Sequence, residues 1–215
     1  MAHDPSPTGT TFDTWITAVF VNNAYKTKRY GVKLDFKDPL AVLPTLKLLH
    51  ETRTTFNHVN INNTLLWLNA DILRGPLGVP AKFDPDRFIE ECQRYFPDAV
   101  LSLGWTTSSP RAICSRCCHL SSRACSWFDS GILGQTYTRA MVDRMLKLCT
   151  RYNLQNVTFP VRCCYVKQSW DQLSRLLDFH PNYSLTIWTS KQDPPSDMNW
   201  IISHVPADRV FLDLN

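Results

Sequence analysis

No stretch of this 215-residue sequence is apolar enough to cross a membrane, because a spanning helix needs about 20 mostly apolar residues. The residues after Met1 are polar and include two prolines, so the sequence as given shows no secretory signal. The 23 basic and 19 acidic residues are intermixed, without a polybasic block, and the net charge is only +4. The sequence therefore predicts neither a transmembrane segment nor a nucleic-acid partner.

The composition also lacks the marks of a disordered chain. Hydrophobic residues make up 44% of the sequence and charged residues 20%, which are ordinary values for a globular protein. A chain of 215 residues can bury the core of one large α/β domain. We therefore expect a single folded domain over residues 1–215.

The eight cysteines do not form a regular framework. Four of them lie between Cys114 and Cys125, with a spacing that matches none of the common paired CxxC zinc sites. The surrounding segment, residues 108–135, shows no periodicity and is longer than the usual connection in a compact domain. We interpret it as an irregular Cys-rich insertion rather than a zinc site.

Strand-like and helix-like segments alternate along the rest of the chain, according to apolar periods of two and of 3.6 residues. Predicted strands are residues 31–36, 64–69, 99–104, 156–161, 183–188 and 209–213. Predicted helices are residues 11–21, 39–52, 85–95, 137–152, 169–179 and 197–204. This alternation predicts the α/β class, with a parallel sheet that is covered by helices and whose strands follow chain order.

Charged residues alternate with apolar ones in the first predicted strand. Lys33, Asp35 and Lys37 share one face, because side chains two apart on a strand point the same way. One interpretation is an exposed edge strand with a polar face. The other is an inner face that carries a metal-binding carboxylate and a phosphate-binding lysine.

Polar or aromatic groups also end the other predicted strands. Because the carboxyl ends of parallel strands are where α/β folds bind ligands, such groups suggest one shared ligand-binding opening at this edge of the sheet, here called the mouth. The candidates for this mouth are Asp35, Lys37, Asn69, Trp105 and Trp188.

Five motifs together resemble the menorin family, and specifically its B-type branch. They are Lys33-Leu-Asp-Phe-Lys37, Trp67-Leu-Asn-Ala-Asp71, Leu101-Ser-Leu-Gly-Trp105, Val157-Thr-Phe-Pro-Val-Arg162 and Ser184-Leu-Thr-Ile-Trp188. The opening Met1-Ala-His-Asp-Pro resembles the family's segment that ends its second strand. The resemblance covers nearly the whole chain except residues 108–135.

The menorin family in turn resembles the phospholipase-C-like phosphodiesterases, which include the glycerophosphodiesterases. The resemblance implies a (β/α)8 TIM barrel that is incomplete, with the first strand and most of the second lying before Met1. It also implies roles for four residues of this chain: His3 as a catalytic histidine, Asp35 as a metal ligand, and Lys37 and Trp188 as substrate-binding residues.

The implied activity is metal-dependent hydrolysis of a phosphodiester, such as a glycerophosphodiester or a lipid headgroup, with Mg²⁺ or Ca²⁺ as cofactor. The resemblance places the other metal-binding carboxylates before Met1, so we expect weak or absent cation binding and an inactive chain. The alternative is a non-catalytic extracellular interaction module with a cell-surface protein partner, in keeping with the family's role in neuronal patterning. The resemblance implies an extracellular location, although a sequence without a signal peptide leaves the cytoplasm open.

Overall fold

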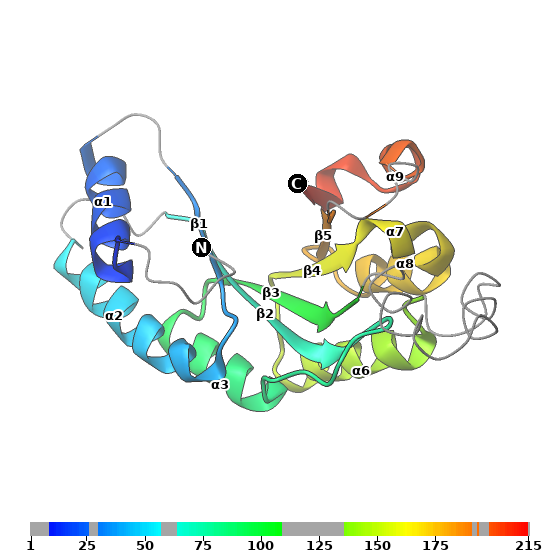
Figure 1. Ribbon diagram of the computed structural model, residues 1–215, viewed down its shortest axis with the longest axis horizontal. Helices are drawn as coiled ribbons and strands as arrows, with labels where there is room; N and C mark the ends of the chain where they lie inside the picture. The colour runs from blue at the N-terminus through cyan, green and yellow to red at the C-terminus, as the bar shows by residue number, and fades with distance from the viewer. Residues whose placement is uncertain are drawn as a thin grey trace, which may run out of the picture. The chain divides into compact units, whose positions relative to one another are not determined.

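Helices and strands alternate along the chain, as Figure 1 shows. The structure is a computed structural model, which describes residues 9–25, 30–56, 64–108, 136–190, 193 and 198–214. The strands are β1 (Val32–Asp35), β2 (Leu66–Arg74), β3 (Val100–Thr106), β4 (Val157–Arg162), β5 (Ser184–Trp188) and β6 (Val210–Asp213). The α-helices are α1 (Phe12–Tyr25), α2 (Val42–Thr55), α3 (Pro85–Tyr95), α6 (Arg139–Arg151), α7 (Cys163–Val166), α8 (Trp170–Phe179) and α9 (Met198–His204). Short 3₁₀ turns are η1 (Pro39–Ala41), η4 (Lys167–Ser169) and η6 (Ala207–Arg209).

The sheet has its strands in chain order, β1-β2-β3-β4-β5-β6. The pairs β1–β2, β4–β5 and β5–β6 are parallel. Since helices stand between the strands, the predicted α/β class and the predicted strand order are confirmed.

Among the elements that differ from the sequence prediction are β2 and the segment before α8. The strand predicted to end at residue 69 continues to Arg74, because Ala70, Ile72 and Leu73 are apolar and become buried. The helix predicted to start at Ser169 is preceded by α7 and η4, and the Ser169 hydroxyl accepts a hydrogen bond from the Tyr137 amide, 2.9 Å away, rather than capping α8.

The described residues form two compact units, each with its own core. The first consists of residues 1–70 and 86–101. In it, α1 lies beside α2 (Figure 1), and their apolar faces bury Ile16, Phe20, Leu46 and Leu49. On β1, Leu34 is buried, as are its apolar neighbours Val32 and Phe36, while the charged residues between them remain partly exposed.

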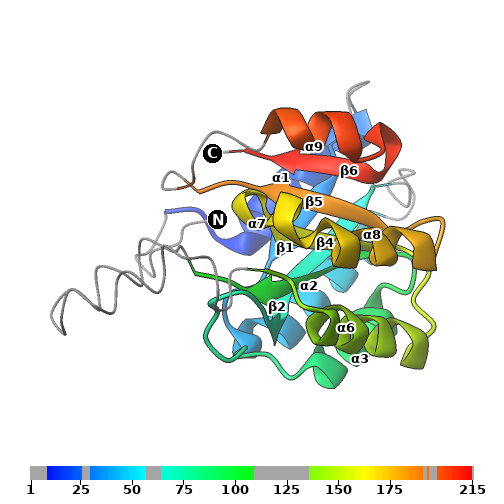
Figure 2. The same ribbon diagram turned by 90° about the vertical axis from the view of Figure 1, so that its right-hand side faces the viewer.

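The second unit consists of residues 71–85 and 102–215, and its core is rich in aromatic rings. Trp105 contacts Tyr137 at 5.3 Å and Phe159 at 6.1 Å between ring centroids, and Phe159 contacts Tyr183 at 5.4 Å. Helices α6 and α8 lie side by side (Figure 2), where Arg175 donates to Asp143 over 2.6 Å. These buried rings meet in tilted and edge-to-face contacts, the geometries that aromatic pairs prefer.

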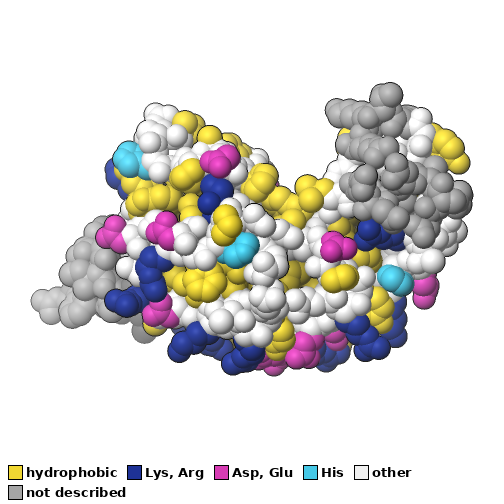
Figure 3. Space-filling model, turned by 180° about the vertical axis from the view of Figure 1, so that it is seen from behind, with side chains coloured by type: hydrophobic (Ala, Val, Ile, Leu, Met, Phe, Trp, Pro, Cys, Tyr) yellow, Lys and Arg dark blue, Asp and Glu magenta, His cyan; other side chains and the backbone are white. Residues whose placement is uncertain are grey.

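The surface carries charges of both signs. Figure 3 shows Lys and Arg side chains in dark blue, intermixed with Asp and Glu in magenta, along the lower edge of the view. This agrees with the intermixed charges of the sequence. Within the described residues, no helix is both long enough and apolar enough to span a lipid bilayer.

Candidate functional site

Asp35 and Lys37 lie together at the carboxyl end of β1. The Lys37 ammonium nitrogen is 2.7 Å from Oδ2 of Asp35, and Nδ2 of Asn69 donates to Oδ1 over 2.7 Å. Asn69 stands opposite Asp35 in the parallel register of β1 and β2, which places both side chains at the same sheet edge. We call Asp35, Lys37 and Asn69 the Asp35 cluster.

The strand period places this cluster on the polar face of β1. Leu34 and Phe36 are buried on the other face, where the Phe36 ring meets that of Phe88 in α3 edge-to-face at 6.0 Å. The side chains of Asp35 and Lys37 remain 34% and 53% exposed. His3, the predicted catalytic histidine, lies outside the described residues.

A divalent cation does not fit the Asp35 cluster as it stands. Mg²⁺ and Ca²⁺ take six or more oxygen ligands, which include waters and carbonyls but also at least one carboxylate that is free to bind. Both carboxylate oxygens of Asp35 already have partners, and Asn69 presents its amide nitrogen to this carboxylate. Among the described residues, no group of three or more His, Cys, Asp or Glu side chains could hold a metal ion.

A second group of polar residues lies at the carboxyl ends of β4 and β5, which run side by side in Figure 2. Arg162 stands opposite Trp188 in the register, and its guanidinium carbon lies 5.0 Å from the centroid of a Trp188 ring. Asp193 accepts from Nε of Arg162 at 3.0 Å and 3.2 Å and lies 2.9 Å from Nη2. We call Arg162, Trp188 and Asp193 the Arg162 cluster.

The ion pair of the Arg162 cluster is almost fully buried, since only 5% of the Arg162 side chain and 3% of the Asp193 side chain are exposed. Trp188 was predicted as a site residue from the sequence, whereas its two charged partners were not. The available signal was Arg162 itself, a charge that ends a completely buried strand. Burying such a charge costs several kcal/mol unless it is paired, so the residue calls for a nearby carboxylate.

Hydroxyl and thiol groups around Arg162 are held in their protonated forms. The Tyr137 hydroxyl accepts a hydrogen bond from the Arg162 amide over 3.0 Å, and burial raises the pKa of this phenol strongly. Burial, with a smaller contribution from the Asp193 carboxylate, raises the pKa of the Cys164 thiol to about 12. Cys164 is therefore a poor nucleophile at neutral pH, because thiolates rather than thiols attack.

Trp105 does not belong to a mouth at the strand ends, contrary to the sequence prediction. Its side chain is 1% exposed and packs between Tyr137 and Phe159. An apolar ring at a strand end can turn either toward a ligand or toward the covering helices, and here the aromatic partners hold it in the core.

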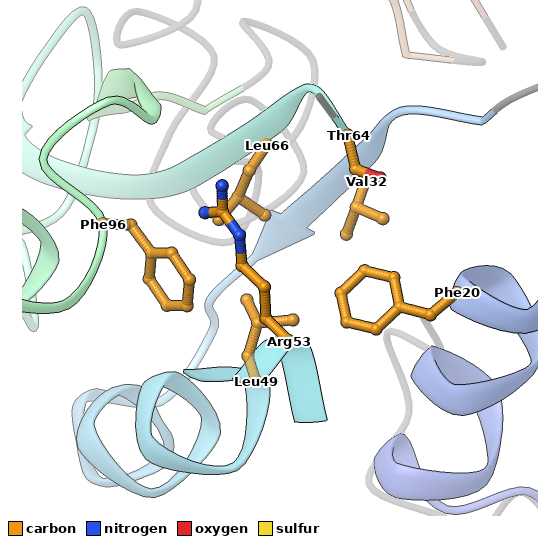
Figure 4. A pocket seen from close by; sticks show the side chains of 7 residues that line it. All are labelled: Phe20, Val32, Leu49, Arg53, Thr64, Leu66 and Phe96. Atoms are coloured by element: carbon orange, nitrogen blue, oxygen red, sulfur yellow. The ribbon is translucent and has the colours of Figure 1, made fainter. Parts of the chain in front are cut away.

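A small pocket in the first unit is shown in Figure 4. It lies at the amino-terminal starts of β1 and β2, whereas the Asp35 cluster lies at the carboxyl end of β1. Its cavity of about 10 Å³ holds at most one water molecule. The lining residues are Phe20, Val32, Leu49, Arg53, Thr64, Leu66 and Phe96.

Comparison with known proteins places these strand-end clusters in context. The model of the menorin N-terminal domain matches residues 1–215, which is the whole chain. This chain belongs to the menorin family. Human protein FAM151B is 35% identical over 217 residues, an alignment that covers 100% of this chain and 67% of FAM151B. No solved structure matches the chain.

The predicted menorin membership is thus confirmed, and the strand-end residues can be read as part of a menorin domain. Of the four predicted site residues, Asp35 and Lys37 are in contact in the first unit. Trp188 belongs to the Arg162 cluster in the second unit. Asn69, a strand-end candidate from the sequence, joins Asp35 and Lys37, while Arg162 and Asp193 are the polar residues that the structure adds.

Proposed function

We propose that this chain binds a phosphodiester at the Asp35 cluster and does not hydrolyse it. The observation that carries the proposal is that both oxygens of the Asp35 carboxylate have partners. Asn69 donates a hydrogen bond to one oxygen, and the Lys37 ammonium forms an ion pair with the other. The carboxylate is thereby used to position an ammonium group rather than a metal ion.

Hydrolysis by the route that the family resemblance implies needs a cation that polarises the phosphodiester and stabilises the leaving oxygen. That cation needs oxygen ligands that include a free carboxylate, and the one carboxylate of the Asp35 cluster is already paired. Neither Lys37 nor Asn69 can replace the missing ligands, because an ammonium group repels a cation and the Asn69 amide nitrogen faces Asp35. The cluster therefore favours binding without turnover.

Lys37 is suited to hold a phosphate oxygen. An ammonium group has three N–H donors, and the contact with Asp35 uses only one of them. The side chain is half exposed, so the remaining donors can reach a ligand at the sheet edge. Lys33, Asp35 and Lys37 together carry one positive charge in excess, which matches the single negative charge of a phosphodiester.

Calorimetric titration with glycerophosphocholine, alongside ³¹P NMR in the presence of Mg²⁺ or Ca²⁺, tests this proposal. We expect binding without hydrolysis, and Lys37→Met should weaken the binding about tenfold, a loss of about 1.4 kcal/mol. Lys47→Met is the matched control, because Lys47 is an exposed lysine of α2 in the same unit. Cation-dependent hydrolysis that disappears in Asp35→Asn would instead establish the phosphodiesterase function.

A second candidate function is the interaction module, and one observation favours it. In the sheet that the structure describes, β6 is the last strand, and its Phe211 and Leu212 are exposed, as is Leu214 just beyond it. An exposed apolar edge is a template for strand addition by another polypeptide. Replacing Leu212 and Leu214 by Lys should abolish capture of a cell-surface partner under this proposal, whereas glycerophosphocholine binding should not change.

Two finer features belong to the same proposal. We propose that the sheet is part of a (β/α)8 barrel, because its strands follow chain order with helices between them. We also propose that the protein acts outside the cell, as the family resemblance implies. An experimental structure of a longer menorin-family protein tests the first, and detection of the protein in the medium of expressing cells tests the second.

A further inference from the structure

The guanidinium of Arg162 is only half used by its carboxylate partner. Arginine has five N–H donors arranged along two edges, each of which can hold two oxygens. Asp193 occupies the edge formed by Nε and Nη2. No described residue accepts a hydrogen bond from Nη1, so the second edge, formed by Nη1 and Nη2, has no acceptor in the part of the chain that the structure describes.

The position of this second edge is fixed from three sides. The Trp188 ring lies against the guanidinium, with the guanidinium carbon 5.0 Å from the ring centroid. The Arg162 main chain is anchored in β4 and donates its amide to the Tyr137 hydroxyl. Asp193 is itself held by the Ser190 amide at 2.8 Å, so it fixes the rotation of the guanidinium.

We propose that the Nη1–Nη2 edge of Arg162 binds an anionic group with two oxygens, a phosphate or a carboxylate, at the carboxyl ends of β4 and β5. The planar guanidinium fork matches two such oxygens in a bidentate contact. This subsite involves none of the residues of the Asp35 cluster, and it therefore stands or fails separately from the proposed function.

The free edge of Arg162 keeps access to solvent. Although only 5% of the side chain is exposed, Nη1 is not among the buried side-chain atoms that lack a partner in the described residues. An anion can therefore replace the water at this edge. A core that needed only packing at this position would be served by an apolar residue, since buried ion pairs are often no more stabilising than apolar side chains of similar size.

The charge of Asp193 sets the expected affinity. Its carboxylate neutralises Arg162 and repels a second anion, so binding to the unchanged protein should be weak, in the millimolar range for a free ion, about 4 kcal/mol. Sharing of the carboxylate with the Ser190 amide reduces this repulsion. Removal of the Asp193 charge should therefore tighten anion binding.

The test is calorimetric titration with inorganic phosphate, dimethyl phosphate and acetate, together with the ¹H–¹⁵N signal of the Arg162 side chain. We expect the Arg162 signal to shift on binding and Arg162→Lys to weaken binding at least tenfold. Arg175→Lys is the matched control, because Arg175 also pairs with an aspartate in this unit but remains partly exposed. A preference for dimethyl phosphate over acetate assigns a phosphodiester ligand, and the reverse order assigns a carboxylate.

Asp193→Asn supplies a second test that does not depend on the folding of Arg162→Lys. The amide keeps an acceptor oxygen for Arg162 but removes the charge, so phosphate affinity should rise about tenfold. Two outcomes would overturn the subsite. One is equal phosphate affinity of the unchanged protein and of Asp193→Asn. The other is an Arg162 signal that does not shift at phosphate concentrations up to 50 mM, about ten times the weakest expected Kd. Lys37→Met should leave the Arg162 shift intact, which separates this subsite from the Asp35 cluster.

Discussion

Asn69 donates a hydrogen bond from Nδ2 to Oδ1 of Asp35 over 2.7 Å, and this bond links the carboxyl ends of two parallel strands. An amide therefore stands beside the only carboxylate of the Asp35 cluster. An amide nitrogen cannot bind a cation, whereas a carboxylate at the same position could bridge one. Asn rather than Asp at position 69 therefore favours ligand binding over metal-dependent hydrolysis.

The first prediction concerns the substitution Asn69→Asp. Two carboxylates in contact repel each other, so the free energy of unfolding without divalent cations should fall by about 1–3 kcal/mol. Addition of 5 mM Ca²⁺ (far above ~10⁻⁴ M, a Kd typical of weak protein sites) should restore part of the loss, because the cation bridges both groups. Melting curves with and without Ca²⁺ measure this effect. Asn182→Asp, an exposed position in the other unit, is the control, and an equal response of both variants to Ca²⁺ would contradict the prediction.

The α/β class and the strand order could be predicted from sequence because both depend on local patterns. Apolar runs and helical periods are short-range properties, and parallel order follows from their alternation. The end of β2 was missed for the same reason: polar Asn69 looked like a terminus, but the strand continues since Ala70 and Ile72 are buried by tertiary packing.

The site was predictable where it depends on the strand period or on strand ends. The contact of Asp35 with Lys37 follows from the strand period. Asn69, 34 positions from Asp35, was grouped with it because both residues end strands. Asp193 lies 31 positions from Arg162, and no pattern along the chain specifies that contact. Trp105 was predicted to lie at the mouth because it is near a strand end. In the structure its aromatic partners hold it in the core, and these contacts could not be predicted from its position in the strand.

The second prediction concerns the buried thiols. Burial raises the pKa of Cys149 and of Cys164 to about 12. At pH 8 only about one thiol in ten thousand would then be ionised, against roughly a quarter for an unperturbed cysteine. Iodoacetamide should therefore label both residues at least a hundredfold more slowly in the folded protein than in urea, as peptide mass spectrometry can measure. Fast labelling of either residue in the folded protein would show that its thiol is accessible.

The third prediction concerns alkaline pH. Burial raises the pKa values of Tyr137, Tyr165 and Tyr183 in the folded state, so the folded protein retains protons that the unfolded chain releases near pH 10. The stabilisation is complete below that pH and is lost above it, by up to about 1.4 kcal/mol per pH unit for each residue. Tyrosinate absorbance should rise together with loss of helical circular dichroism. Ionisation of these phenols in a protein that retains its helices would contradict the assignment.

The fourth prediction concerns Gly78, which packs against the end of β3. A Cβ atom at this position would lie 1.9 Å from the carbonyl oxygen of Thr106. Because the obstacle is backbone, Gly78→Ala should lower the free energy of unfolding by about 2–4 kcal/mol. Gly9→Ala is the control, since a Cβ there would meet nothing within 4 Å. Urea unfolding midpoints compare the two, and similar values would show that the backbone near Gly78 yields easily.

The last prediction concerns the hydrogen bond between Thr158 of β4 and Thr186 of β5. Their hydroxyl oxygens are 2.8 Å apart and both residues are buried. Thr→Val keeps the shape but removes the hydroxyl, so either single substitution leaves a buried hydroxyl without its partner and should cost about 1–3 kcal/mol. The double substitution removes both groups together and should cost less than the sum of the single ones, with a coupling of about 1 kcal/mol. Urea unfolding of the four proteins in this cycle measures the coupling. Strictly additive losses would mean that the two hydroxyls contribute separately and that this bond does not hold β4 to β5.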